Sequence, residues 1–131
     1  MSDGPAPRPG PTVLIVDDSE DTARMMRLLL KRAGYAPIVA HDGPEAIAAA
    51  EAQRPSVVLL DLSLPTMSGQ AVAEAIRARP HLDGVALVAV SGFPPDGPPA
   101  ATPFAHHLIK PVDPDALLTI LARLVAARDA P

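Results

Sequence analysis

Short, mostly apolar runs alternate along this chain with longer segments in which apolar side chains recur every three or four positions. The short runs lie at residues 12–16, 36–40, 56–60, 85–90 and 106–109. The longer segments lie at residues 19–34, 42–54, 68–79 and 113–128. None of the runs shows the strict apolar–polar alternation that is typical of a strand with one wet face. The pattern predicts five parallel strands, right-handed crossovers, and helices on both faces of the sheet.

Residues at the ends of the longer segments favour helices there. Ser19, Asp42 and Asp113 precede their segments, and each side chain can accept a hydrogen bond from an N–H of the first helical turn. Pro114 occupies a first helical position, where no N–H is needed, and Gly34 can end the first helix in a left-handed conformation. We therefore expect four helices that begin and end close to these residues.

The segment before the fifth run departs from the alternation. Residues 91–111 read "SGFPPDGPPAATPFAHHLIKP", with five prolines before Lys110, where a further helix would complete the repeat. A proline inside a helix costs about 3 kcal/mol, and the residue before each proline favours extended geometry. We expect residues 92–104 to form an ordered or semi-ordered loop with at most one short turn.

The composition narrows the class of protein. A chain of 131 residues fits one domain, which we place at residues 12–127 between a proline-rich tail at 1–11 and a short tail at 128–131. The absence of cysteine argues against disulfides and thiolate metal sites and fits a reducing, cytoplasmic location. No segment has the pattern of a signal peptide or a membrane span. A net charge of −4 and few aromatic residues argue against direct nucleic-acid binding.

Polar residues whose side chains can bind ions or take part in reactions directly follow four of the five runs. They are Asp17 with Asp18, then Asp61, Ser91 and Lys110. The carboxyl ends of parallel strands share one edge of a sheet, and ligands of open α/β sheets bind outside that edge. Each residue alone has an ordinary interpretation as a turn, a cap or an exposed charge. Taken together, they predict that three carboxylates, a hydroxyl and an ammonium group converge on one site.

Four segments resemble the signature segments of the receiver domain of bacterial two-component response regulators. They are "VLIVDDS", "VVLLDLSLPTMSG", "VAVSG" and "HLIKPVDP", in the same order as in that family. The resemblance covers nearly the whole chain and implies a flavodoxin-like α/β fold with strand order 2-1-3-4-5. It identifies the phosphoacceptor as Asp61, the acidic pair as Asp17 and Asp18, the switch hydroxyl as Ser91, and the lysine beside a cis Lys–Pro bond as Lys110.

The same resemblance implies Mg²⁺ as cofactor and a phosphohistidine as phosphoryl donor. Three close carboxylates repel one another unless a cation joins them, and oxygen ligands suit a hard ion. We expect Asp18, Asp61 and the backbone carbonyl of Ser63 to ligate Mg²⁺ directly, and Asp17 to act largely through water. The Asp61 carboxylate would then attack the phosphoryl group while Lys110 neutralises part of its charge. The chain is thus expected to be a signalling receiver that catalyses only its own phosphorylation and dephosphorylation.

Two positions modify this expectation. The family usually has an aromatic residue three positions before the lysine, and His107 stands there. A histidine can also act as a rotamer switch and adds possible pH sensitivity, although an ordinary half-exposed strand histidine is the alternative. Phe93, two residues beyond Ser91, is expected to shield the site from water.

The first helix offers a candidate docking surface. Its buried face is predicted to carry Ala23, Met26, Leu30 and Ala33. Met25 and Leu28 point away from that face, close to the acidic pair, where a histidine kinase or a histidine phosphotransfer protein could dock. Single exposed apolar residues are also ordinary. Since the family uses its fourth helix for output and dimerisation, the missing helix predicts a monomer or a weak dimer.

Three alternatives stay open beside a stand-alone receiver. A pseudo-receiver would act as a docking module without phosphorylation, although such proteins usually lack one of the residues retained here. The chain could also be the receiver segment of a hybrid kinase or of a larger regulator. A phosphatase of the haloacid dehalogenase type also forms an aspartyl phosphate, but it needs a second aspartate two residues after the nucleophile, where Ser63 stands.

Overall fold

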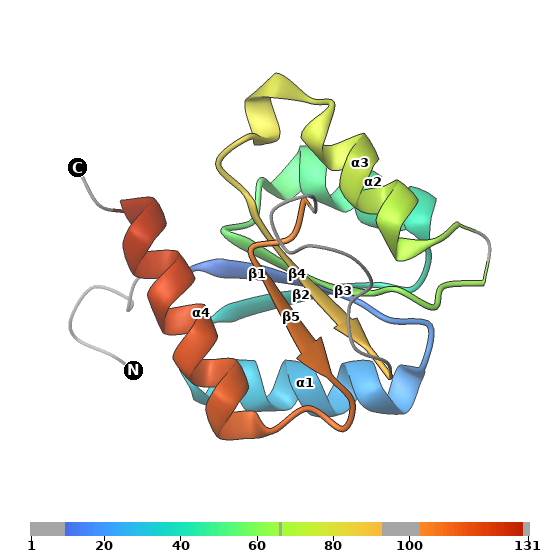
Figure 1. Ribbon diagram of the computed structural model, residues 1–131. Coiled ribbons are helices and arrows are strands. Elements are labelled where there is room, and N and C mark those ends of the chain that lie inside the picture. The colour runs from blue at the N-terminus through green and yellow to red at the C-terminus, as the bar shows by residue number, and fades with distance from the viewer. Residues whose placement is uncertain (1–9, 66, 93–102, 130–131) are drawn as a thin grey trace, which may run out of the picture.

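The computed structural model describes residues 10–65, 67–92 and 103–129 (Figure 1). The elements in chain order are β1 (Thr12–Val16), α1 (Glu20–Arg32), β2 (Ala36–Ala40), α2 (Gly43–Gln53), β3 (Val57–Asp61), α3 (Gly69–Arg77), the 3₁₀ turn η1 (Pro80–Leu82), β4 (Ala86–Ser91), β5 (His106–Ile109) and α4 (Pro114–Asp129). Of the helices in these described ranges, none is long and apolar enough to cross a bilayer.

The five strands form one parallel sheet in the order β2-β1-β3-β4-β5. This confirms the predicted flavodoxin-like α/β topology. The third and fourth strands each begin and end one residue later than the apolar runs indicated. As a result, Asp61 and Ser91 are themselves the last residues of β3 and β4, and the register pairs Ser91 with Ile109.

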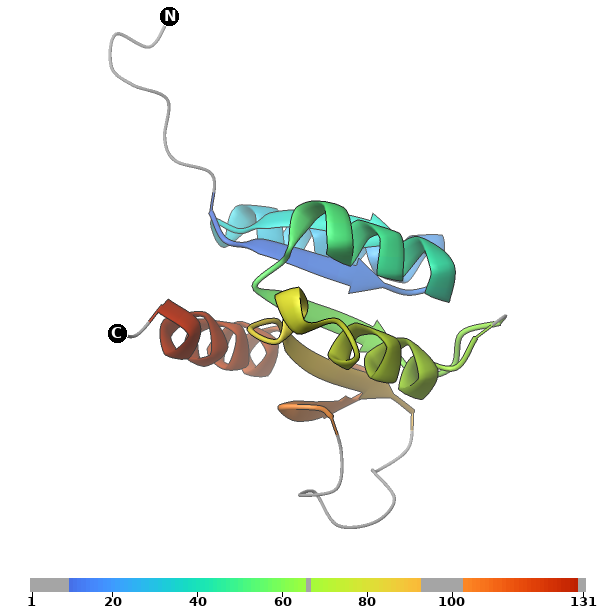
Figure 2. The same ribbon diagram turned by 90° about the horizontal axis from the view of Figure 1, so that it is seen from above.

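Helices cover both faces of the sheet, α1 and α4 on one and α2 and α3 on the other (Figures 1 and 2). Alternate side chains of each inner strand enter the two cores. In β1, Val13 and Ile15 pack with α1 and α4, whereas Leu14 and Val16 pack with α2 and α3. All four side chains are buried, so β1 is a central strand with no wet face.

Local capping explains where the helices begin. Ser19, Asp42 and Asp113 each accept a hydrogen bond from the backbone N–H three residues later, as predicted. Gly34 follows α1 with a φ of 96°, a conformation that glycine adopts readily. The prediction that Ala33 lies on the buried face of this helix was wrong: α1 ends at Arg32, so Ala33 is its exposed cap residue.

The proline-rich loop predicted at residues 92–104 lies largely outside the described residues, which omit 93–102, and Phe93 falls in the same gap. Between β4 and β5, no helix occurs within the part of the chain that is described. The loop conformation and the shielding role of Phe93 stay predictions.

Candidate functional site

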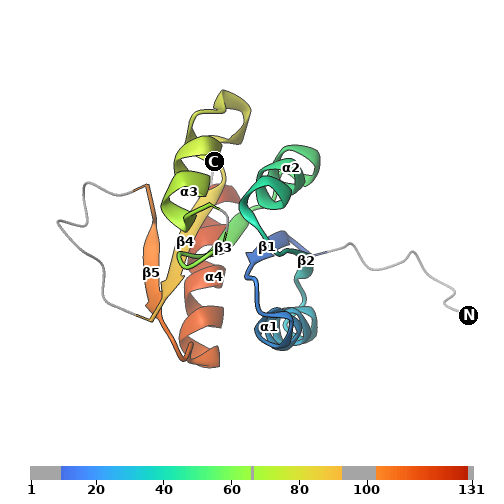
Figure 3. The same cartoon turned by 90° about the vertical axis from the view of Figure 1, so that its right-hand side faces the viewer.

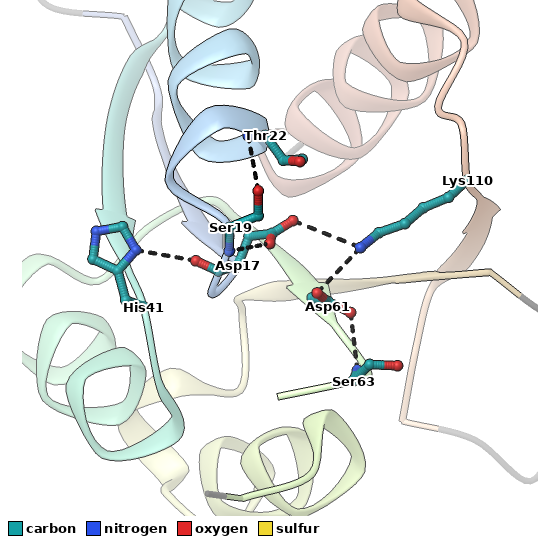
Figure 4. A network of polar contacts seen from close by, with 7 residues as sticks. All are labelled: Asp17, Ser19, Thr22, His41, Asp61, Ser63 and Lys110. Atoms are coloured by element: carbon teal, nitrogen blue, oxygen red, sulfur yellow. Dashed lines mark hydrogen bonds and ion pairs between the residues drawn. The ribbon is translucent and has the colours of Figure 1, made fainter. Parts of the chain in front are cut away.

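The candidate site lies at the carboxyl edge of the sheet, where β1, β3 and β5 end (Figure 4). Asp17 directly follows β1, Asp61 is the last residue of β3, and Lys110 directly follows β5. Because β1 and β3 are neighbours, their carboxyl ends place the two aspartates side by side. The convergence predicted for the carboxylates and the ammonium group is therefore present in the fold.

The three carboxylates form a compact cluster. One oxygen from each of Asp17, Asp18 and Asp61 lies within 4.8 Å of the others. Asp17 and Asp61 are each 3% exposed, whereas Asp18 is exposed to solvent. The cluster thus has two buried members and one open member, and its oxygen donors are of the kind that a hard divalent cation binds.

The two buried carboxylates are held in the same way. Oδ1 of Asp17 accepts the N–H of Ser19 at 2.9 Å, and Oδ1 of Asp61 accepts the N–H of Ser63 at 2.9 Å. The second oxygen of each faces Lys110, whose Nζ lies 3.1 Å from Oδ2 of Asp61 and 3.8 Å from Oδ2 of Asp17. A single ammonium group therefore joins the two carboxylates while backbone donors fix their orientation (Figure 4).

Burial raises the pKa of Asp17 above its ordinary value, and the neighbouring carboxylates of Asp61 and Asp18 raise it further. The Ser19 N–H and the Lys110 ammonium act in the opposite direction but do not offset the burial. The ionised form of Asp17 is therefore held at a cost to the folded protein, which a bound cation would reduce.

Ser91, the predicted switch residue, contacts one residue of β5 and the residue that follows it. Its carbonyl accepts the N–H of Lys110 at 2.8 Å, and its hydroxyl lies 2.9 Å from Nε2 of His107. His107 is half-buried, and the Lys110–Pro111 peptide bond is cis, as the resemblance implied. Ser91 thus links the backbone of the lysine to the histidine that replaces the usual aromatic residue.

Two residues near the cluster were not found by sequence reasoning. Nδ1 of His41, directly after β2, lies 3.1 Å from the backbone carbonyl of Asp17. Gly69 begins α3, and a Cβ atom there would lie 2.6 Å from the carbonyl oxygen of Asp61. His41 stands at a strand end like the recognised residues, so the neighbouring positions of β1 and β2 could have drawn attention to it. Nothing in the sequence marks Gly69.

The candidate docking residues on α1 are exposed as predicted. Met25 is 73% exposed and Leu28 is 50% exposed. Met25 also lines an apolar pocket of about 480 Å³ beside the site. The lining of that pocket is Thr22, Met25, Met26, Val90, Lys110, Pro111 and Val112. Leu28 does not line it, so the two residues occupy different parts of the exposed helix surface.

Comparison with known proteins gives one consistent family. Residues 13–122 match the family model described as the response regulator receiver domain. Over 78 residues the chain is 41% identical to the sensory transduction protein RegX3 of Mycolicibacterium smegmatis. That alignment covers 60% of this chain and 34% of RegX3, so the chain spans about a third of this relative's length.

Solved structures agree with this match. The CheY-like receiver domain from Methylobacillus flagellatus superposes with a TM-score of 0.81 and 34% identity, covering 88% of this chain and 98% of that one. The receiver domain of the sensor histidine kinase PA1611 from Pseudomonas aeruginosa gives a TM-score of 0.81 and 27% identity, covering 89% and 98%. That structure is described with a magnesium ion coordinated in its active-site cleft.

Proposed function

Because the chain belongs to the response regulator receiver domain family of two-component signalling, we propose that it accepts a phosphoryl group from a phosphohistidine on the carboxylate of Asp61. One observation carries the proposal: Asp61 ends the central strand, is 3% exposed, and lies 3.1 Å from the Lys110 ammonium within the cluster of three carboxylates. Clustered carboxylates that are buried beside a lysine mark a candidate functional site, and a carboxylate can act as the nucleophile in group transfer.

The donor set fits Mg²⁺. The charges of Asp17, Asp18 and Asp61 sum to −3, and Lys110 contributes +1, which leaves −2 for a divalent cation to balance. Asp18, Asp61 and the backbone carbonyl of Ser63 are the proposed direct ligands, with Asp17 acting through water. When bound, the cation supplies charge neutralisation at the phosphoryl oxygens and at the attacking carboxylate.

The residues of the chain supply the remaining chemistry. An oxygen of Asp61 attacks the phosphorus atom, the P–N bond to the donor imidazole breaks, and the imidazole nitrogen keeps the electron pair. The N–H of Ser63 holds Oδ1 of Asp61 at 2.9 Å, which fixes the direction of attack. Lys110 loses its contact with Oδ2 and pairs with a phosphoryl oxygen instead. The step consumes no co-reactant beyond the donor.

Ser91 is the proposed reporter of the modification. Its hydroxyl would donate a hydrogen bond to a phosphoryl oxygen, and its contact with His107 would then be broken. This local change biases the positions of the β4 end and of β5, because Ser91 also accepts the N–H of Lys110. His107 is therefore proposed as part of the switch.

The wider assignments are proposals of the same kind. Residues 12–127 form the receiver domain, which would act in the cytoplasm and receive its phosphoryl group from a histidine kinase or a histidine phosphotransfer protein docked near Met25 and Leu28. The domain is expected to be a monomer or a weak dimer. RegX3 is about three times as long as the segment it shares with this chain, so the activity of any larger protein is not transferred from it.

Intact mass spectrometry tests the central proposal. Incubation with Mg²⁺ and acetyl phosphate should add one phosphoryl mass to the wild type and none to Asp61→Asn. Asp115→Asn, which removes an exposed carboxylate of α4, is the matched control and should be labelled like the wild type. Labelling of Asp61→Asn at the wild-type level would refute the assignment, and a wild type that stays unlabelled would favour the pseudo-receiver.

A further inference from the structure

A second groove borders a different flank of α1. It lies between α1 and β2 and has a volume of about 590 Å³. β2 forms an edge of the sheet and lies between α1 and α2 (Figure 3). The lining of this α1–β2 groove is Glu20, Ala23, Arg24, Arg27, Pro37, Ile38, Val39 and His41. It shares no lining residue with the apolar pocket beside Lys110, so the two depressions are separate.

The α1–β2 groove concentrates positive charge on an acidic protein. Arg24 and Arg27 are exposed, and Lys31 continues the same flank of α1 one turn further on. Among the described residues, ion pairs join only Arg79 with Glu51 and Lys110 with two aspartates. Neither arginine of the groove is therefore paired there, not even with Glu20 on the same helix. The net charge of the chain is −4, so this flank is opposite in sign to the whole.

The edge strand itself is poorly suited to strand addition. The N–H of Ala36 and the C=O of Ala40 make hydrogen bonds on the β1 side. Because backbone groups alternate in direction along a strand, those of Pro37 and Val39 face the open edge. Pro37 has no N–H to donate, which interrupts any added ladder. A ligand in this groove must therefore be held mainly by side chains.

We propose that the α1–β2 groove binds an acidic segment of a partner protein. The guanidinium groups of Arg24 and Arg27 would each pair with a carboxylate, since their planar donor arrays match carboxylate geometry. Half-buried Val39, whose side chain lies on the α1 side of the sheet, offers an apolar contact for a side chain between the acidic residues. The lining contains no Phe, Tyr or Trp on which a base could stack, which favours a protein segment over a nucleic acid.

His41 connects the groove to the carboxylate cluster. The carbonyl of Asp17 can only accept a hydrogen bond, so Nδ1 of His41 donates to it at 3.1 Å and Nε2 is left for other contacts. A ligand that touches His41 is thus one side chain away from the backbone of a cluster residue (Figure 4). Occupancy of the groove is therefore expected to shift the amide signals near Asp17.

Fluorescence anisotropy with a defined probe tests the proposal. The probe is a fluorescein-labelled peptide of six glutamates around two central leucines, titrated with the 131-residue chain at low salt. We expect saturable binding that is about tenfold weaker for Arg24→Gln/Arg27→Gln, because this variant loses both proposed ion pairs at an exposed surface. Arg123→Glu on α4 is the control, because it changes the net charge by the same two units at an exposed site outside the groove. That control should bind like the wild type.

Further measurements separate the possible outcomes. Amide shifts of ¹⁵N-labelled protein should move at residues 20–27 and 38–41, and should move elsewhere only near Asp17. If binding weakens equally in the double variant and in the Arg123→Glu control, the effect comes from net charge alone and not from the groove. That result would overturn the proposal. Absence of saturation with the wild type, or equally tight binding of a single-stranded DNA oligonucleotide, would also overturn it. Phosphoryl labelling of Asp61 is measured on the same variants and should be unchanged, so failure of that proposal would be seen independently.

Discussion

The hydroxyl of Ser91 lies 2.9 Å from Nε2 of His107, so a strand-end serine and a histidine of the neighbouring strand form a hydrogen bond. When the His107 ring carries its proton on Nδ1, Nε2 accepts a hydrogen bond from the Ser91 hydroxyl. A phosphoryl oxygen on Asp61 would require the same proton. Since one hydroxyl proton serves one strong acceptor at a time, His107 in this tautomer would compete with the phosphoryl group for Ser91.

This competition predicts that His107→Phe binds a phosphoryl mimic more tightly. Loss of one net hydrogen bond, worth about 1 kcal/mol, corresponds to roughly fivefold tighter binding of beryllofluoride with Mg²⁺. Calorimetric titration measures the difference. In a Ser91→Ala background the histidine substitution should have no effect, because the contested proton is gone. Weaker binding by His107→Phe in the presence of Ser91 would contradict the competition.

The unequal exposure of the acidic pair predicts unequal metal affinities. Asp18 is open to solvent and is the proposed direct ligand, whereas Asp17 is buried against Lys110. Asp18→Ala should weaken Mg²⁺ binding by about tenfold more than Asp17→Ala. Titration calorimetry of both variants gives the comparison, with Asp115→Ala as an unaffected control. Equal losses, or a larger loss for Asp17→Ala, would reverse the proposed roles.

The raised pKa of Asp17 predicts how stability depends on pH. Burial makes the folded protein bind a proton at Asp17 more tightly than the unfolded chain, whose value is near 3.8. The contribution of this group to the free energy of unfolding therefore falls as pH rises from 3.8 through the raised pKa. Without Mg²⁺, Asp17→Asn should be more stable than the wild type above that window, because Asn can still accept the Ser19 N–H.

Urea denaturation followed by circular dichroism tests this prediction at several pH values. The difference between the variant and the wild type should shrink below pH 3.8, where the carboxyl group is protonated in both states. Saturating Mg²⁺ should also shrink it by stabilising the wild type. A variant that is less stable at neutral pH without Mg²⁺ would mean that the Lys110 contact outweighs the cost of burial.

Gly69 is predicted to be intolerant of a side chain. A Cβ there would lie 2.6 Å from the carbonyl oxygen of Asp61 and 2.7 Å from Cα of Leu62, both backbone atoms that cannot rotate away. Gly69→Ala should therefore lower the free energy of unfolding by about 1–3 kcal/mol and displace Asp61. Gly92→Ala is the control, since a Cβ at Gly92 would meet no atom of the described residues within 4 Å. Equal stability of the two variants in urea would argue against the close contact.

Local rules explain why the sequence predicted most of the fold. The capping roles of Ser19, Asp42 and Asp113 depend on hydrogen bonds three residues away, so the sequence contains both partners. The carboxylate cluster was predictable because parallel strands bring their carboxyl ends to one edge. The placement of Asp17, Asp18, Asp61 and Lys110 at one site followed from that rule.

Contacts that depend on the path of the backbone between elements could not be predicted from the sequence. The His41 contact with Asp17 requires the two strand ends to lie at the same height, and the Gly69 contact requires the loop after β3 to return beneath Asp61. The bond between Ser91 and His107 depends on the register of β4 against β5, which places Ala89 opposite His107. None of these is set by spacing along the chain.

The order of the strands divides the site between two halves of the sheet. β3 holds Asp61, the proposed acceptor, in the middle. β1 leads into Asp17 and Asp18 on one side, and β4 and β5 contribute Ser91 and His107 on the other. The acidic pair of the proposed cation site and the residues proposed to respond to phosphorylation thus lie on opposite sides of β3. Lys110, after β5, contacts both buried aspartates, whereas His107 contacts Ser91, so the residue at position 107 can change without removing a contact to the acids. This arrangement explains how the chain can have His107 where the family usually has an aromatic residue and still keep Asp17, Asp18 and Asp61.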